Sequence, residues 1–160
     1  MIDLIVNAHV VTLYENRKIT IYKTIVVLSN LDGMIMPYRG ILNTLISNGF
    51  ISGLVILDSV GNIWWHTGFF PQFKNYLLDG YKLLSEWVCY PESTKVCGVP
   101  YTSFINSYPD YWILKSNHEK GSIILQLCPK NKYYFLCYTK EGQNPFKIQQ
   151  KVAEMAELFG

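Results

Sequence analysis

Apolar residues recur with a helical period in three segments of the chain. The first segment follows residue 36, and its apolar positions are Tyr38, Ile41, Leu42, Leu45 and Ile46. This i, i+3, i+4, i+7, i+8 spacing marks one face of a helix, and Asn48-Gly49 is a typical C-terminal stop. The third segment ends the chain, with apolar positions at Ile148, Val152, Met155, Ala156 and Phe159. Both patterns predict amphipathic helices.

The middle helical segment opens at Pro71, a residue favoured in the first turn of a helix. Its pattern continues to about residue 88 through Phe73, Tyr76, Leu77, Tyr81, Leu84, Trp87 and Val88. Gly80 falls inside this run and weakens it slightly, because glycine is a poor helix former. The pattern predicts one helix from residue 71 to about residue 88.

Short apolar and β-branched runs, bounded by turn formers, lie between these helices. GLVILD (53–58) and IWWHT (63–67) flank the turn sequence SVGN, which predicts a β-hairpin. Four further runs follow the loop expected at 90–100, with SYPD, NHEKG and CPKNK between them. These four predicted strands cover residues 101–106, 110–115, 121–128 and 132–138.

The order of elements after residue 36 is helix, two strands, helix, four strands, helix. An antiparallel sheet with a helix at each end is an α+β domain. We expect the terminal helices to share one face of the sheet and the middle helix to cover the other. Residues 1–36 are treated as an N-terminal extension, with a probable β-hairpin at 2–29, and residues 37–160 as the main domain.

Charge and cysteine content narrow the class of protein. The formal net charge of +2 is too small for a nucleic-acid footprint. The segment from residue 111 to 151 contains seven lysines and only two glutamates, which suggests a basic surface for an acidic protein or anionic lipid.

The four cysteines form no C-x-x-C pair, and their apolar settings indicate buried thiols. With no signal peptide or membrane-length apolar run, we expect a cytoplasmic protein.

Catalytic and cofactor motifs are absent from the sequence. It has no glycine-rich phosphate loop, no H-E-x-x-H and no G-x-S-x-G. The three histidines are far apart, and no pair of carboxylates stands out. We therefore expect neither an enzyme nor a bound cofactor or metal ion.

The segment SVGNIWWHTGFFP places two tryptophans side by side in a predicted strand. Neighbouring residues of a regular strand point to opposite faces. Trp64 and Trp65 are therefore expected on opposite faces, with Trp65 under the middle helix and the more buried of the two.

Two segments resemble the profilin family. SGLVILDSVGNIWWHTGFFPQF is similar to its pattern of apolar strand, glycine turn, tryptophan and phenylalanine-proline helix entry. TKEGQNPFKIQQKVAEMAELF is similar to a profilin C-terminal helix and the loop before it. The order of elements over 37–160 agrees. Residues 1–36 have no counterpart in an ordinary profilin, whereas profilin-like proteins of Asgard archaea are similar in carrying an N-terminal extension.

The resemblance implies two binding surfaces and no catalysis. Profilins bind monomeric actin and so regulate its polymerisation, which would associate this chain with the cytoskeleton. The implied actin-binding residues are Tyr101, Ser103, Lys115, Gln143, Asn144, Gln149, Gln150 and Lys151. Pro145 and Phe146 replace glycines of family members. A monomer in solution is expected, and the lysine surplus agrees with the phosphoinositide binding of profilins.

Profilins also bind proline-rich segments in an aromatic groove between the terminal helices. The implied residues of this polyproline site are Tyr38, Ile41, Trp64, Leu158 and Phe159. Ile41 replaces a frequent tyrosine, and the chain ends before the terminal tyrosine of many profilins. The alternative hypothesis is a roadblock/longin-type regulator or scaffold of small GTPases, which would form a homodimer and not bind actin.

Overall fold

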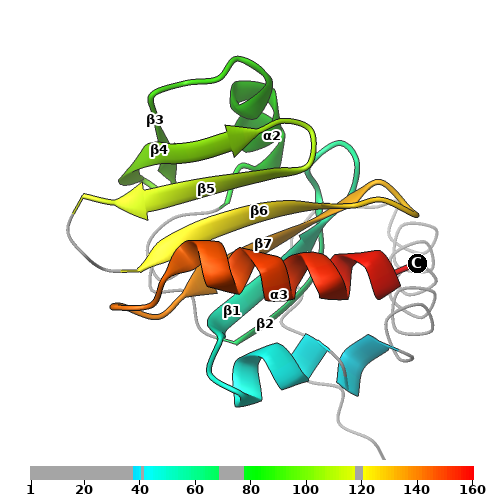
Figure 1. Cartoon of the computed structure of the whole chain (residues 1–160). Helices are drawn as coiled ribbons and strands as arrows, with labels where there is room; N and C mark the ends of the chain where they lie inside the picture. Colours follow the sequence, from blue (N-terminus) through cyan, green and yellow to red (C-terminus); the bar gives the residue numbers. More distant parts are fainter. Residues whose placement is uncertain (1–37, 41, 69–77, 118–120) are drawn as a thin grey trace, which may run out of the picture.

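A computed structural model of the chain describes residues 38–40, 42–68, 78–117 and 121–160. Seven strands within these residues form one antiparallel sheet in the order β2-β1-β7-β6-β5-β4-β3 (Figure 1). The strands are β1 (Ile51–Leu57), β2 (Ile63–Gly68), β3 (Ser93–Val96), β4 (Val99–Ser107), β5 (Tyr111–Ser116), β6 (Ser122–Cys128) and β7 (Tyr133–Thr139). The hairpin expected at 2–29 lies outside the described residues.

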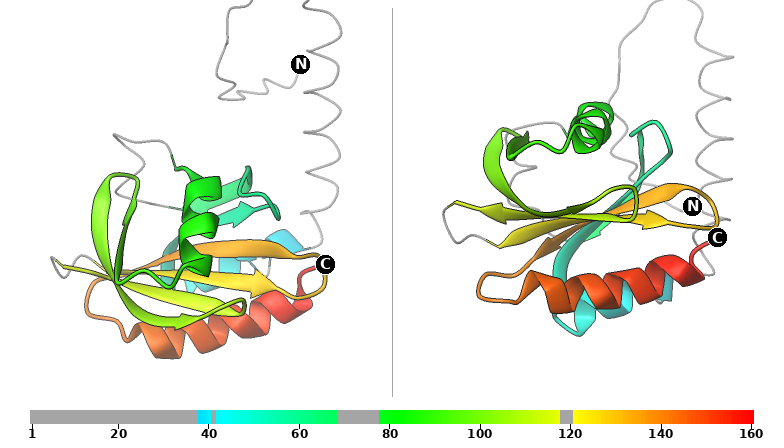
Figure 2. Two further views of the ribbon diagram at one scale, coloured as in Figure 1. Left: turned by 90° about the horizontal axis from the view of Figure 1, so that it is seen from above. Right: turned by 45° about the horizontal axis from the view of Figure 1, so that its top comes forward.

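Helices cover both faces of the sheet, as the sequence predicted (Figure 2). The first helix, residues 38–40 and 42–47, lies on the same face as α3 (Pro145–Leu158). Its Leu42 and Leu45 pack with Val152 and Ala156 of α3 in one core cluster. α2 (Gly80–Val88) covers the opposite face, where Leu83 and Trp87 join a second cluster. The result is the expected α+β arrangement.

The first helix stops where the sequence predicted. Gly49 has a φ of 75°, in the left-handed region that glycine adopts readily. Its N–H donates to the carbonyl of Ile46 at 3.0 Å, and the N–H of Phe50 donates to Leu45 at 3.1 Å. This pair of bonds is the Schellman motif, which satisfies the last carbonyls of the helix and sends the chain into β1.

α2 is shorter than the sequence predicted, because residues 78 and 79 are not helical. Its N-cap is Asp79, whose carboxylate accepts from the Lys82 N–H at 2.9 Å. Two residues assigned to the apolar face, Tyr81 and Val88, are exposed, whereas Leu83 is buried. Gly80 explains the change of face, because it sits directly against the backbone of Gly61 and fixes how the helix is rotated. Pro71, Phe73, Tyr76 and Leu77 lie outside the described residues.

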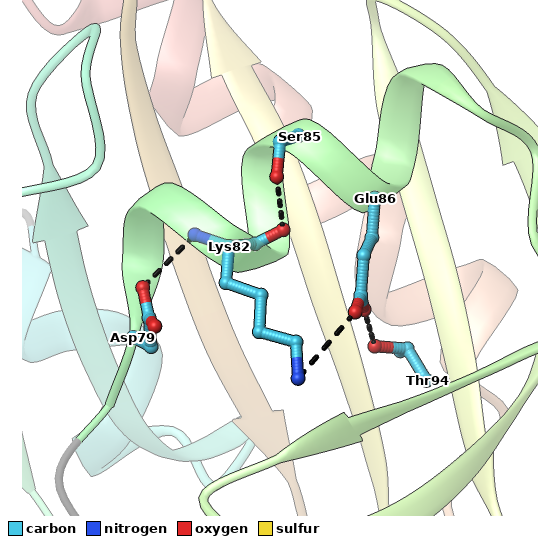
Figure 3. A network of polar contacts seen from close by, with 5 residues as sticks. All are labelled: Asp79, Lys82, Ser85, Glu86 and Thr94. Atoms are coloured by element: carbon cyan, nitrogen blue, oxygen red, sulfur yellow. Dashed lines mark hydrogen bonds and ion pairs between the residues drawn. The ribbon is translucent and has the colours of Figure 1, made fainter.

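A polar network ties α2 to the edge of the sheet (Figure 3). The Thr94 hydroxyl on β3 donates to the Glu86 carboxylate, which also pairs with the Lys82 ammonium at 3.7 Å. Within the helix, the Ser85 hydroxyl donates to the Lys82 carbonyl at 2.8 Å. Both partners of the Glu86 carboxylate, Thr94 and Lys82, therefore lie within the protein itself.

Strand β3 lies where the sequence predicted a loop, so that prediction was wrong. β3 pairs with β4 through a two-residue turn, with Val96 opposite Val99. The turn residues Cys97 and Gly98 both have positive φ, 50° and 79°. This is the geometry of a tight type I′ hairpin. Cys is an unusual residue at the first position, and the Cys-Gly pair therefore gave a weak signal.

Candidate binding surfaces

Trp64 and Trp65 both pack against the core cluster on the face of the terminal helices. The expectation of opposite faces was wrong because β2 contains a β-bulge. Trp65 lies opposite Ile56, but Ile63 lies opposite Leu57, so Trp64 is an extra residue in the pairing. An extra residue breaks the alternation of side chains along a strand. Both tryptophans are half-buried.

Trp64 belongs to an aromatic cluster between the first helix and the end of α3. We define this cluster as Tyr38, Trp64, Tyr133 and Phe159. The Trp64 and Tyr133 rings meet edge to face at 4.8 Å between centroids, and the Tyr38 and Phe159 rings at 5.1 Å. Tyr38, Trp64 and Tyr133 are half-buried, so each leaves part of its ring accessible.

Two of the other predicted polyproline residues, Phe159 and Leu158, differ sharply in exposure. Phe159 is only 1% exposed and packs on Phe135. It therefore supports the other rings of the cluster from the core side and has almost no surface for a ligand to contact. Leu158 is 54% exposed beside it. Ile41 lies outside the described residues. Tyr133, which the sequence did not single out, becomes part of the cluster because the β6–β7 turn places it beside Trp64.

A surface pocket of about 530 Å³ lies at the start of α3, and we name it the α3 pocket. It is lined by Phe104, Ile105, Lys115, Ser122, Gly142, Gln143, Asn144, Pro145 and Phe146. Three residues predicted for the actin-binding surface, Lys115, Gln143 and Asn144, therefore come together in one place. They come from β5 and from the loop that precedes α3.

Two exposed phenylalanines flank the lysine of this pocket: Phe146, which replaces a glycine of family members, and Phe104, which no pattern in the sequence singled out. Phe104 is 50% exposed and Phe146 is 41% exposed. The Lys115 ammonium lies 3.4 Å from the centre of the Phe104 ring, a cation–π contact. The pairing of β4 with β5 shifts around Phe104, from Ser103–Leu114 to Ile105–Ile113. This irregularity, which the sequence does not announce, exposes the ring.

The polar wall of the α3 pocket is held in place by its own hydrogen bonds. The Gln143 side-chain amide donates to the Gly49 carbonyl at 2.6 Å, and its oxygen accepts from the Lys140 N–H at 3.1 Å. Asn144 is the N-cap of α3 and accepts from the Phe146 N–H at 3.0 Å. These bonds link the pocket to the end of the first helix and position its polar wall.

Two of the predicted actin-binding residues are buried, which corrects their placement. Tyr101 is fully buried in the cluster on the α2 face. Gln149 is 6% exposed and donates to the Gln126 side-chain oxygen at 2.9 Å. Tyr101 points inward because side chains alternate along β4, and Gln149 points inward because of its position in the helical period of α3. Neither side chain is therefore available to a partner on the surface.

The remaining predicted residues lie outside the pocket lining. Ser103 is half-buried, and its hydroxyl accepts from the Trp112 indole N–H at 2.8 Å. Gln150 and Lys151 are exposed on α3, where Lys151 pairs with Glu154 at 3.1 Å. These two continue the surface of the α3 pocket along the helix.

The cysteines follow the predicted burial with one exception. Cys128 and Cys137 are buried, and burial raises the pKa of both thiols. Burial also raises the pKa of Cys97 to about 11. Cys89 is exposed at the end of α2, contrary to expectation. The described ranges contain no group of three or more potential metal ligands and no helix long and apolar enough to cross a membrane.

Neither a scan against protein-family models nor a search of curated proteins finds a match to this sequence. Solved structures do match. LokiProfilin1 aligns with a TM-score of 0.63 at 19% identity, over 77% of this chain and 95% of its own. The chain has the profilin fold. This confirms the fold class that the resemblance implied.

Other profilin structures agree with this assignment. The complex of LokiProfilin1 with rabbit actin aligns with a TM-score of 0.61 at 18% identity, over 77% of this chain and 93% of the other. Profilin IA of Acanthamoeba castellanii gives 0.58 at 16% identity, over 76% and 94%. Mouse profilin IIa, solved with a double repeat from the FH1 domain of mDia1, gives 0.50 at 13%, over 76% and 94%. The profilin fold thus accounts for about three quarters of the chain.

Proposed function

We propose that this chain binds actin monomers one to one and thereby regulates actin polymerisation. The α3 pocket, with two exposed phenylalanines beside a lysine, carries the proposal. The same fold occurs in LokiProfilin1, which has been solved in complex with rabbit actin. The proposed contact surface comprises Phe104, Lys115, Gln143, Asn144, Phe146, Gln150 and Lys151, with Ser103 at its margin.

The chemistry of this surface suits a protein partner. Aromatic side chains at the centre of an interface supply most of its binding energy, and Phe104 and Phe146 each still expose a large part of their surface. Burying the rest of each ring would contribute on the order of 1 kcal/mol. Lys115, Gln150 and Lys151 surround them with polar groups, as the rim of an interface requires.

The mechanism is stoichiometric binding. A protein bound to one end of an actin monomer blocks the contacts needed to form a nucleus. Any effect on nucleotide exchange would come from preferential binding to one actin conformation, which shifts a population and makes or breaks no covalent bond.

An actin polymerisation assay tests the proposal. We expect the wild-type chain to delay nucleation in a dose-dependent way. Phe146→Ala and Lys115→Glu should bind actin about tenfold more weakly and therefore delay nucleation less at the same concentration. Lys130→Glu is the matched control, because Lys130 is exposed on the β6–β7 turn at the other end of α3. No delay with any actin, together with a dimer in solution, would favour the roadblock/longin alternative.

The aromatic cluster supports a second proposal, that the chain binds proline-rich segments. A polyproline II helix is extended before binding and packs well on flat aromatic rings. Trp64, Tyr133 and Tyr38 present such rings in half-buried positions. A double repeat of an FH1 domain is bound by the mouse profilin of similar fold.

Tryptophan fluorescence on titration with a ten-residue proline peptide measures this interaction. We expect saturable quenching and at least fivefold weaker binding for Trp64→Phe, because a smaller ring covers less of the ligand. The neighbouring Trp65→Phe is the matched control and should bind as the wild type does. Equal losses in both variants would point to a general loosening of β2 and would contradict a specific groove.

Anionic lipid is the third proposed ligand. Exposed lysines gather around the N-terminal half of α3 and on β5, at Lys115, Lys140, Lys147 and Lys151. Clustered lysines near a surface of anionic headgroups are attracted by about 1 kcal/mol each. Because this lysine surface overlaps the α3 pocket, phosphoinositides and actin are expected to compete for it.

A further inference from the structure

The turn between β6 and β7 carries a buried hydrogen-bond donor that has no acceptor among the described residues. This donor is the side-chain amide nitrogen of Asn131, Nδ2. The oxygen of the same amide does have a partner, because Oδ1 accepts from the Tyr133 N–H at 3.0 Å. That bond fixes which end of the amide is which. Buried polar groups in folded proteins nearly always have a partner, so the exception at Asn131 requires an explanation.

Asn131 adjoins the aromatic cluster. Its amide holds the backbone of Tyr133, whose ring meets the ring of Trp64. On another side lies Gly160, the residue after Phe159, and a Cβ atom added to Gly160 would be 3.2 Å from Nδ2. Both views in Figure 2 show the β6–β7 turn beside the end of α3. The donor therefore lies at the edge of the ring surface proposed above for proline-rich segments.

The Asn131 amide lies just beneath the molecular surface. Asn131 as a whole is half-buried, and its neighbours Lys130 and Gly160 are both exposed. Gly160 has no side chain, so on this side an acceptor reaches Nδ2 once the Gly160 backbone moves aside. A ligand on the aromatic cluster therefore has a short path to the donor.

A proline-rich segment presents the acceptors that such a donor needs. Proline has no backbone N–H, and the carbonyl groups of a polyproline II helix make no hydrogen bonds within the helix. A bound segment of this kind brings acceptors and almost no donors, so its binding site has to supply donors as well as rings. The Nδ2 group of an asparagine carries two N–H donors.

We propose that Asn131 is a specificity-determining residue of the proline-rich site, and that its Nδ2 donates to a backbone carbonyl of the bound segment. Gly160 moves aside when this bond forms. The inference rests on the proposed binding of proline-rich segments and adds a polar contact to it. Flat rings accept any extended apolar segment, whereas a donor at a fixed place also sets where a carbonyl of the segment must lie.

Asn131→Asp tests the donor with little other change, because a carboxylate oxygen still accepts from the Tyr133 N–H. The full chain is titrated with a ten-residue proline peptide blocked at both ends, and tryptophan fluorescence is followed. We expect about fivefold weaker binding than for the wild type, the usual effect of one hydrogen bond.

Lys132→Asn is the matched control for charge. It lowers the net charge by the same amount on the same turn, at an exposed position whose φ of 61° asparagine tolerates. This variant should bind the peptide as the wild type does. An equal loss in both variants would assign the effect to charge and would overturn the role of Asn131.

The side-chain amide resonances of Asn131 report the contact directly in the unmodified sequence. In the ¹⁵N-labelled wild-type chain, they are identified by their absence from the spectrum of Asn131→Asp. We expect at least one Nδ2 proton to shift downfield as the proline peptide is added, and to saturate together with the fluorescence change. This measurement does not depend on how well a variant folds.

The inference and the proposed function fail in different ways. If the wild type does not bind the proline peptide, the proline-rich site is contradicted and the role of Asn131 with it. If Trp64→Phe weakens binding but Asn131→Asp binds as tightly as the wild type, the site stands and the role of Asn131 is overturned. Asn131 amide resonances that do not move on saturation with peptide would overturn it as well.

Discussion

At the scale of single residues, Gly61 and Gly80 let two pieces of backbone meet without side chains between them. A Cβ atom added to Gly80 would lie 2.1 Å from the Gly61 carbonyl oxygen, and one added to Gly61 would lie 2.3 Å from the Tyr81 nitrogen. Neither distance is sterically possible. The start of α2 therefore rests directly on the β1–β2 turn, and this contact sets which face of the helix is buried.

Replacement of Gly80 by alanine is expected to destabilise the chain, against the usual effect of alanine in a helix. The clash with Gly61 should cost about 2 kcal/mol, the usual size of an overpacking penalty. Gly40→Ala is the matched control, because Gly40 is helical and nothing lies within 4 Å of its added Cβ. That control should gain about 0.5–1 kcal/mol. Thermal unfolding of both variants measures the difference, and a stabilised Gly80→Ala would contradict the packing described.

Single residues also mark the limit of what the sequence could predict about the site. The motif around Trp64 located the aromatic cluster, but the alternation rule placed Trp65 on the wrong face because a β-bulge leaves no mark in the sequence. Lys115, Gln143 and Asn144 were found through the resemblance, and they line one pocket. Tyr101 came from the same alignment but is buried, because a shift of one residue in a strand reverses its faces. Gln149, also from that alignment, is buried on the side of α3 that faces Gln126.

At the scale of elements, α3 is fastened to the sheet by a buried polar contact as well as by its apolar face. The Gln149 amide donates to the Gln126 side chain, and the Gln126 amide donates in turn to the carbonyls of Asp110 and Leu127, each at 3.1 Å. The chain of bonds thus runs from α3 through β6 to the β4–β5 turn. Such contacts specify one position of a helix, whereas an apolar face alone permits sliding.

Gln149→Leu is expected to destabilise the chain by about 1–3 kcal/mol, because the Gln126 oxygen would be buried without a donor. The adjacent Gln150→Leu replaces an exposed glutamine with the same side chain and should change the free energy of unfolding by less than about 0.5 kcal/mol. Urea unfolding of the two variants gives both values. Equal effects would show that the Gln126–Gln149 contact contributes nothing.

The elements with a clear pattern and clear ends were predicted well from sequence. The first helix, α3 and the strands β1, β2, β4, β5, β6 and β7 lie within a few residues of the expected bounds. β3 was missed because a Cys-Gly turn is a weak signal and the strand has only four residues. The end of α2 was predicted correctly, but the helix begins at Gly80, and its rotation depends on a tertiary contact between two glycines. Contacts of this kind have no local sequence signature.

At the scale of the whole molecule, four exposed lysines lie on neighbouring elements. They are Lys115 on β5, Lys140 in the loop before α3, and Lys147 and Lys151 on α3. The small net charge of +2 does not reveal this grouping. An anionic surface would therefore approach the molecule from the side of α3.

Sedimentation with vesicles that contain phosphatidylinositol bisphosphate tests the basic face. We expect binding that falls as salt rises, because exposed charges are screened. Lys147→Glu combined with Lys151→Glu should reduce it several-fold, and addition of actin should release the chain from vesicles. Lys82→Glu, on the opposite face, is the control and should retain binding. Unchanged binding by the double variant would contradict a lipid surface on α3.

The position of β1 in the sheet has a consequence for folding during synthesis on the ribosome. β1 is buried between β2 and β7, yet β7 is synthesised about 80 residues later, which takes about 4–16 s at ordinary rates of translation. Leu54, Val55 and Ile56 are fully buried in the folded protein. During that interval, however, β7 is not yet available to pair with them. The nascent chain therefore exposes an apolar strand with one unpaired edge for several seconds. A chaperone that binds such strands would act between the synthesis of β1 and that of β7.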